Sequence, residues 1–144
     1  MTRTNIQKER DNILTKDSDN LEKKIILLVE DDQISAYLIQ EYLKAYHSQK
    51  QNLDYIHIKQ GKDAIDYCKR KKADLVLMDI KLEDSNGIDI TRNIKNINPD
   101  LTIIAQTAYT SDDVRKEAID AGCSDYLTKP VSLEKFETIL EKYL

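Results

Sequence analysis

Residues 75–79 read Leu75-Val76-Leu77-Met78-Asp79, an apolar run that ends in a carboxylate. A short run of this composition predicts a buried strand. The presence of Asp79 at the end of this run requires an explanation, because a carboxylate without a partner is costly to bury. Three more apolar runs end in polar residues in the same way. They are residues 25–29 before Glu30-Asp31-Asp32, residues 103–105 before Gln106-Thr107, and residues 126–127 before Thr128-Lys129-Pro130.

From Lys24 onward, short apolar strands alternate with stretches of helical period, in five such units. This alternation is typical of parallel βαβ units with helices on both faces of a sheet. The sequence therefore predicts an α/β fold with a single, doubly wound, five-stranded parallel sheet. In residues 53–58, the side chains of Leu53, Tyr55 and His57 alternate with those of Asp54, Ile56 and Ile58. This alternation favours an edge strand.

Each helical stretch carries an apolar stripe that we expect to face the sheet. The predicted stripes are Ile34, Leu38, Ile39, Tyr42 and Leu43; Ala64, Ile65 and Cys68; Ile90 and Ile94; Val114, Ala118 and Ala121; and Leu133, Phe136, Leu140 and Tyr143. Asp32, either Thr110 or Ser111, and Ser132 are predicted to begin helices, and Gly122 to end one. Gly87 is expected to adopt backbone angles that other residues avoid.

The 144 residues, 40% of them hydrophobic, predict one domain over residues 24–144, preceded by a flexible polar tail or linker at 1–23. Charged residues of both signs are mixed, so nucleic acid is not indicated as a direct partner. The apolar runs are too short to cross a membrane, and the net charge of −4 suits a cytoplasmic protein. Cys68 and Cys123 are isolated and are expected to be small buried residues.

The carboxyl ends of parallel strands meet in the crevice where open α/β sheets bind ligands. Carboxylates packed together raise one another's pKa unless a cation compensates. Glu30, Asp31 and Asp79 therefore predict a site for Mg²⁺, which prefers oxygen ligands. With Asp79 as a nucleophile, Lys129 as a point charge and Thr107 as a hydroxyl donor, the site suits phosphoryl transfer through an acyl phosphate.

Each feature also has a simpler explanation when it is taken alone. The acids at 30–32 suit the N-terminal end of a helix dipole. Thr107 is an ordinary β-branched strand residue, and Lys129 could be a solvated loop charge. The combination of all these features at successive strand ends favours the site.

Four segments resemble the receiver domain of two-component response regulators, namely residues 25–31, 77–79, 103–108 and 122–130. The likeness extends from about Lys24 to Leu144. It implies a flavodoxin-like (β/α)5 fold with strand order 2-1-3-4-5. It also implies a histidine kinase or histidine phosphotransfer protein as phosphoryl donor, a downstream protein of unknown identity, and no turnover of the usual enzymatic kind.

The resemblance further implies the roles of individual residues. Asp79 would be the phosphoacceptor, with Asp31 as a direct Mg²⁺ ligand, Glu30 as a water-mediated ligand and the carbonyl of Lys81 as a further ligand. Thr107 and Tyr126 would be switch residues, although Tyr126 also suits an edge aromatic that packs on the sheet. The Lys129–Pro130 peptide would be cis.

Glu83 stands where receivers often have a proline, in the loop after the phosphoacceptor. Lys81 and Tyr109 are expected to control an attacking water, and bulky Tyr109 to slow hydrolysis. Exposed Tyr and Ile side chains on the fourth and fifth helices would permit a homodimer.

Two other functions remain open at this point: a phosphohydrolase, which needs a second acid near Asp79, and a phosphate-independent binding module, which would lack a site residue. A stand-alone regulator and a receiver excised from a hybrid kinase are both compatible with the chain.

Overall fold

The computed structural model describes residues 23–109 and 111–144. Five parallel strands form one sheet in the order β2-β1-β3-β4-β5, as predicted. The elements are β1 (Lys24–Val29), α2 (Gln33–Gln49), β2 (Leu53–Ile58), α3 (Gly61–Arg70), β3 (Leu75–Asp79), α4 (Gly87–Ile97), β4 (Thr102–Thr107), α5 (Asp112–Ala121), β5 (Asp125–Thr128) and α6 (Leu133–Tyr143). Among the described residues, no helix combines the length and apolar character that a membrane crossing requires.

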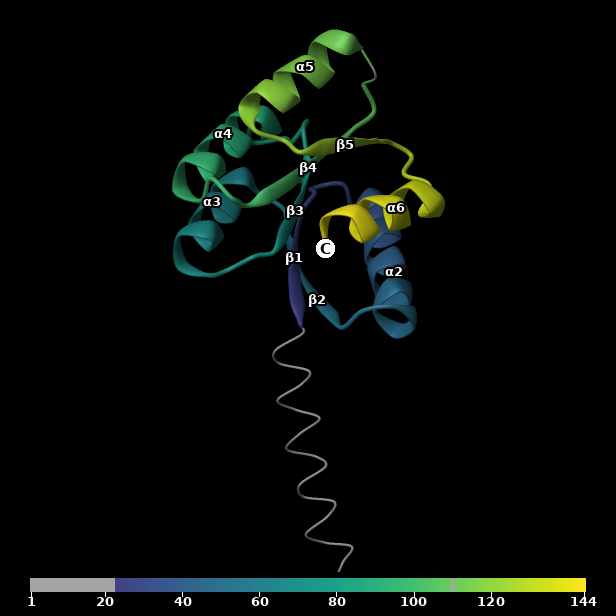
Figure 1. Cartoon of the computed structure of the whole chain (residues 1–144). Coiled ribbons are helices and arrows are strands. Elements are labelled where there is room, and N and C mark those ends of the chain that lie inside the picture. The colour runs from purple at the N-terminus through teal and green to yellow at the C-terminus, as the bar shows by residue number, and fades with distance from the viewer. Residues whose placement is uncertain (1–22, 110) are drawn as a thin grey trace, which may run out of the picture.

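The helices cover both faces of the sheet, with α3, α4 and α5 on one side and α2 and α6 on the other (Figure 1). Each face therefore has its own hydrophobic core. One is built around Ile94, Val76 and Ile103, and the other around Phe136, Leu77 and Ile104. Because the central strands are buried on both faces, they need the continuous apolar runs from which they were predicted.

Strand β3 lies between β1 and β4, and all its residues are buried. Strand β2 is an edge strand, as its alternation indicated. This central position of β3 fixes the end of the strand, and with it Asp79, by hydrogen bonding on both sides.

The predicted helix boundaries are confirmed where the structure describes them. Asp32, Ser111 and Ser132 accept hydrogen bonds from the first turns of α2, α5 and α6. Gly122 ends α5 with φ of 115°, a conformation that favours glycine. Thr110, the alternative cap, lies outside the described residues, as do residues 1–22 of the predicted tail. Lys23 is described and pairs with Asp54 at 3.3 Å.

The reason given for Gly87 was wrong, because among the described residues only Gly122 has a positive φ. Space is what requires glycine at this position. A Cβ on Gly87 would lie 2.1 Å from the carbonyl oxygen of Asp79. The start of α4 therefore packs directly on the backbone of the strand end that carries the acid.

Several predicted buried positions are also wrong in part. Ile65 and Val114 are half-buried and pack against the core. Ile34 is 81% exposed and Leu133 is 43% exposed, since both lie in the first turn of their helices, at the rim of the sheet. Cys68 is only half-buried, whereas Cys123 is buried as expected. Ile139, which the prediction for α6 did not include, is buried.

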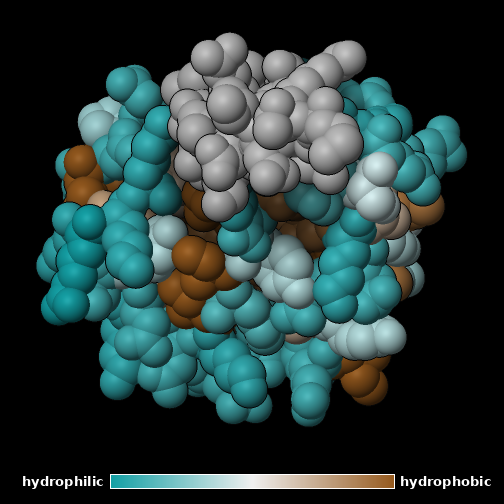
Figure 2. All heavy atoms as spheres, turned by 90° about the horizontal axis from the view of Figure 1, so that it is seen from below, coloured by the Kyte–Doolittle hydropathy of each residue, from teal (hydrophilic) through white to brown (hydrophobic). Residues whose placement is uncertain are grey.

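The surface seen from below in Figure 2 is mostly hydrophilic outside the grey atoms. Hydrophobic side chains appear there as small separate groups. Scattered apolar side chains of this kind are normal on a protein surface. The part of this face that the described residues form therefore gives no indication of a broad apolar interface.

Candidate functional site

Three carboxylates meet at the carboxyl end of the sheet. Glu30 and Asp31 directly follow β1, and Asp79 ends β3. One oxygen atom from each lies within 4.8 Å of the others. Glu30 and Asp79 are buried, and Asp31 is half-buried. The predicted cluster of acids therefore exists, because β1 and β3 are neighbours in the sheet and end at the same level.

Lys129 joins two of these acids. It follows β5, and its ammonium Nζ donates to Glu30 Oε1 at 2.5 Å and lies 3.3 Å from Asp79 Oδ2. Its backbone N–H donates to the carbonyl of Thr107 at 2.8 Å, and the peptide to Pro130 is cis, as the resemblance implied. The alternative of a solvated loop charge is wrong, because only 19% of the Lys129 side chain is exposed.

The pKa values of Glu30 and Lys129 are both shifted in this buried site. Burial raises the pKa of Glu30 to about 7, and its hydrogen bond with Asp79 adds to the increase, while Lys129 opposes it. Burial also acts to lower the pKa of Lys129, but its contacts with Glu30 and Asp79 prevail and raise that pKa. Burial and the neighbouring Asp79 therefore favour the protonated form of Glu30, and Lys129 offsets only part of this effect.

The loop that follows β3 holds the second oxygen of Asp79. The backbone N–H of Lys81 donates to Asp79 Oδ1 at 3.1 Å, and the N–H of Gly87 donates to the carbonyl of Ile80 at 2.7 Å. Lys81 and Asn86 pair as an isolated antiparallel bridge that closes the loop. Both carboxylate oxygens of Asp79 thus have fixed partners, one from the backbone and one from Lys129.

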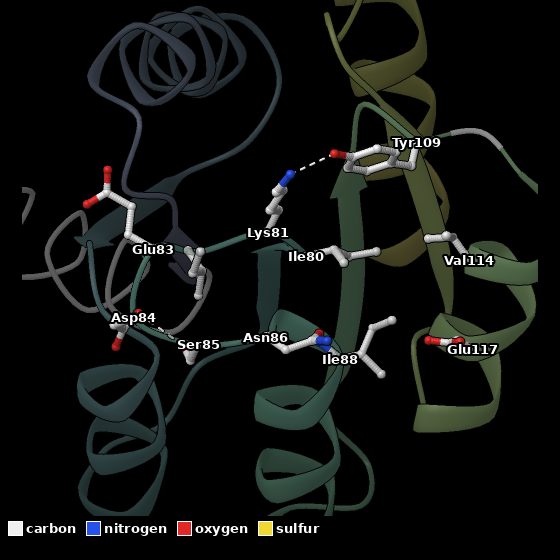
Figure 3. Close-up of a pocket in the computed structure, with 11 residues that line it drawn as sticks. Ile80, Lys81, Glu83, Asp84, Ser85, Asn86, Ile88, Tyr109, Val114 and Glu117 are labelled. Atoms are coloured by element: carbon white, nitrogen blue, oxygen red, sulfur yellow. Dashed lines mark hydrogen bonds between the residues drawn. The ribbon is translucent and has the colours of Figure 1, made fainter.

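Lys81 and Tyr109 lie beside this loop and point toward each other (Figure 3). The ammonium of Lys81 donates to the hydroxyl of Tyr109 at 2.7 Å and lies 5.1 Å from the centre of its ring. The backbone N–H of Tyr109 donates to the hydroxyl of Thr107 at 2.9 Å. Tyr109 therefore connects the end of β4 with the loop that follows Asp79.

Thr107 ends β4, and Tyr126 lies in the neighbouring strand β5, opposite Ala105. Thr107 is buried, and its strand partner is Thr128. Tyr126 is half-buried and packs against the core beneath α3, α4 and α5, as an edge aromatic would. The guanidinium of Arg115 on α5 lies 4.1 Å from the centre of its ring.

Several contacts with the acids were not predicted. The backbone N–H of Asp32 donates to Glu30 Oε2 at 3.2 Å. The backbone N–H of Glu83 donates to Asp31 Oδ2 at 2.6 Å. His57 Nε2 lies 2.7 Å from the carbonyl oxygen of Glu30, and its Nδ1 lies 3.1 Å from the side-chain amide of Gln40. The sequence contained an indication of the Glu83 contact, because this chain lacks the proline that receivers often have at that position, and proline has no backbone N–H to donate. A histidine near the end of the edge strand gave no comparable signal.

Comparison with known proteins identifies the fold family. The family model of the response regulator receiver domain matches residues 26–141. The transcriptional regulatory protein ZraR of Salmonella typhimurium is 36% identical over 121 residues, which cover 84% of this chain and 26% of ZraR. The polar-differentiation response regulator DivK of Brucella anthropi is 27% identical over 84% of this chain and 96% of DivK. The chain thus spans about a quarter of the ZraR relative.

Solved structures agree with the family model. The receiver domain of the sensor histidine kinase PA1611 of Pseudomonas aeruginosa PAO1, which contains a magnesium ion in its active-site cleft, is 28% identical with a TM-score of 0.75. It covers 84% of this chain, and the match covers 97% of that domain. The receiver domain of Ssk1 from Saccharomyces cerevisiae, in complex with the histidine phosphotransfer protein Ypd1, is 26% identical with a TM-score of 0.75, over 85% of this chain and 89% of that one.

The match to the family model extends over most of the chain. The chain therefore belongs to the family of response regulator receiver domains, which makes it a phosphoryl acceptor of two-component signalling rather than a classical enzyme.

Proposed function

We propose that Asp79 is the phosphoacceptor and takes a phosphoryl group from the phosphohistidine of a histidine kinase or a histidine phosphotransfer protein. The bond from the histidine nitrogen to phosphorus breaks as a bond from a carboxylate oxygen of Asp79 forms. The observation that supports this role is the position of Asp79 at the end of β3, buried and held by Lys81 N–H and Lys129 Nζ. A carboxylate held in one orientation is prepared for attack.

Mg²⁺ suits the residues that surround Asp79. Three carboxylates lie together, and Lys129 is bonded to two of them. Burial raises the pKa of Glu30, and its hydrogen bond with Asp79 adds to the increase. Oxygen donors of this kind select a hard cation. Asp31 and Asp79 would hold the ion directly, Glu30 through water, and the carbonyl of Lys81 would complete the protein ligands. When bound, Mg²⁺ neutralises the negative charge of the acids and of the incoming phosphoryl group.

Lys129, Thr107 and Tyr126 would carry the response. Lys129 exchanges part of its contact with Asp79 for the phosphoryl oxygens, and the hydroxyl of Thr107 donates to a phosphoryl oxygen. Moving Thr107 also moves Tyr109, whose N–H is bonded to it. These new bonds exist in one state only, so they shift the population toward that state and alter the surface around α5 and β5, including Tyr126.

The partners follow from this scheme. The domain would act in the cytoplasm on a downstream protein, and α5 and α6 would provide a face for a homodimer. Ile119 on α5 is 47% exposed and available to such a face, whereas Ile139 on α6 is buried and is not. The N-terminal residues would serve as a tail or linker to the receiver domain.

The phosphohydrolase alternative receives no support from the site. Such an enzyme needs a second acid close to the nucleophile to activate water. The residue at the corresponding place is Lys81, whose ammonium is bonded to Tyr109. The phosphate-independent binding module is also disfavoured, because each residue expected of a phosphoacceptor site is present.

The identity of the acceptor is tested by Asp79→Asn. After incubation with acetyl phosphate and Mg²⁺, intact mass spectrometry should show one hydroxylamine-labile phosphoryl adduct on the wild type and none on this variant. Asp84→Asn, which changes an exposed carboxylate in the adjacent loop, is the matched control and should keep the adduct. An adduct that survives in Asp79→Asn would assign the chemistry to another residue.

Mg²⁺ binding should depend on pH through Glu30. Because folding raises this pKa from 4.5 to about 7, the proton that Glu30 retains favours the folded state. That contribution is fully present below pH 4.5 and is lost as the pH rises through about 7. Mg²⁺ binds the ionised acid, so the increase in Tm on adding MgCl₂ should be larger near pH 8 than near pH 6. Thermal melts of the wild type and Glu30→Gln measure this.

In Glu30→Gln, the increase in Tm on adding MgCl₂ should differ less between pH 6 and pH 8, because the titrating group has been removed. A wild-type protein whose Tm rises equally with MgCl₂ at both pH values would contradict the involvement of Glu30.

Glu83 should weaken Mg²⁺ binding through its backbone. Its N–H occupies Asp31 Oδ2, and proline has no N–H to do so. Glu83→Gln removes the charge but keeps the N–H, so it is the matched control for Glu83→Pro. Calorimetric titration with MgCl₂ should give a Kd for Glu83→Pro about fivefold lower than for Glu83→Gln, which corresponds to about 1 kcal/mol for one hydrogen bond. Equal Kd values would show that the N–H does not compete with the metal.

Tyr109 should slow hydrolysis of the phosphorylated protein. Its ring and its bond to Lys81 lie beside the phosphoacceptor and restrict the approach of water. Mass spectrometry over time should therefore show a severalfold shorter phosphoryl half-life for Tyr109→Ala. Tyr109→Phe keeps the ring but loses the hydroxyl. The phosphoryl half-life of this variant should lie between those of the wild type and Tyr109→Ala. If Tyr109→Ala matched the wild type, Tyr109 would have no part in shielding the phosphoryl group.

A further inference from the structure

A groove lies beside the phosphoacceptor site, between the loop that follows β3 and helix α5 (Figure 3). Its volume is 510 Å³, which falls within the range of roughly 300–1,000 Å³ that holds drug-sized ligands. Ile80, Ile88 and Val114 give it an apolar base. Val114 is half-buried and Tyr109 is 49% exposed, so an occupant of the groove can reach apolar surface on both.

Three exposed carboxylates line this groove and have no cation to pair with. Glu83 and Asp84 lie in the loop on one side, and Glu117 lies on α5 on the other side (Figure 3). Within residues 23–109 and 111–144, none of the three takes part in an ion pair. The donors to Asp84 are a backbone N–H and the hydroxyl of Ser85, which are both neutral.

Lys81 is the basic residue among those that line the groove. Its ammonium donates to the hydroxyl of Tyr109 rather than to a carboxylate, so the three acids gain no direct contact from it. Three negative charges and one positive charge leave the groove acidic. A surface with an excess of one sign of charge favours partners of the opposite sign.

The apolar base and the acidic walls together select the kind of occupant. A small inorganic cation would gain nothing from the apolar base, and an aliphatic side chain alone would leave the acids unpaired. Arginine has a methylene stem that packs on apolar surface and a guanidinium that binds a carboxylate through two parallel hydrogen bonds. Both features of the groove are therefore satisfied by a segment that carries arginine next to aliphatic residues.

We propose that this groove docks a basic segment of a partner protein. One arginine of the segment lays its methylene groups on Ile88 and Val114 and binds Glu117 through its guanidinium. Val114 and Glu117 are three residues apart on α5, so they lie on the same face of that helix. A second basic residue of the segment faces Glu83 and Asp84. Docking is a property of the chain itself and does not depend on phosphoryl transfer.

Two capped peptides test the proposal. One has the sequence Leu-Arg-Ala-Leu-Arg, and in the other both arginines are replaced by citrulline, which has a similar shape but no charge. NMR titrations of the nitrogen-15-labelled, unphosphorylated chain should give a Kd for the arginine peptide about tenfold lower than for the citrulline peptide, because hydrogen bonds to charged groups are stronger. The backbone signals that move should belong to residues 80–88 and 114–117. Added NaCl should weaken the arginine peptide and leave the citrulline peptide unchanged.

Glu117→Gln tests the central contact, because it keeps the shape of an exposed side chain and removes its charge. The arginine peptide should bind this variant about fivefold more weakly, and the citrulline peptide should bind it like the wild type. Asp100→Asn is the matched control. It changes the net charge equally, at an exposed acid before β4 and thus at the opposite edge of the sheet from the end of β3, and it should bind the arginine peptide like the wild type.

Glu117→Gln should also accept a phosphoryl group from acetyl phosphate like the wild type. Failure of the docking proposal and failure of the phosphoacceptor proposal therefore give different results.

Three outcomes would overturn the docking proposal. Equal Kd values for the two peptides would show that the groove does not recognise the guanidinium. If Asp100→Asn weakened the arginine peptide as much as Glu117→Gln does, the net charge of the chain would account for binding and no groove would be needed. Chemical shift changes confined to α2 and the segment after β5 would place the peptide on a different surface.

Discussion

The ammonium of Lys129 between Glu30 and Asp79 is the interaction on which the site depends. Without this cation, three acids at the ends of two adjacent strands would repel one another in a place that water barely reaches. Lys129 follows β5, which is not adjacent to β3 because β4 lies between them, and its side chain still contacts both Glu30 and Asp79. The electrostatics of the site therefore depend on a residue that follows β5, two strands away from β3 in the sheet.

The sequence was sufficient to predict the sheet and the residues that meet at its end. Each central strand is a continuous apolar run followed by polar residues, and a parallel sheet must bring such ends together. Helix boundaries at Asp32 and Gly122 could be predicted for a similar reason, since capping depends on a single residue and its neighbours. Strong local signals and one topological rule thus account for most of the correct predictions.

The incorrect or missing predictions concern contacts that form only when different elements pack together. Helical periodicity places Ile34 on the apolar face of α2, but it does not say that the sheet ends before the first turn of that helix. Gly87 was assigned a special conformation, whereas the backbone of Asp79 leaves no room for a side chain. The bond from Glu83 N–H to Asp31 crosses from one loop to another and has no sequence periodicity. Such features depend on three-dimensional packing.

The two sides of the site differ in how firmly the sheet holds them. Asp79 ends a strand that is hydrogen-bonded on both sides and buried on both faces. Tyr126 and Lys129 belong to β5 and the turn after it, at the border of the sheet, where a strand of four residues has one neighbour. Local opening at the edges of the sheet should therefore spare β3. The carboxylate proposed as the acceptor thus ends a strand that is held on both sides, whereas the groups proposed to respond to it lie in an edge strand and the turn after it.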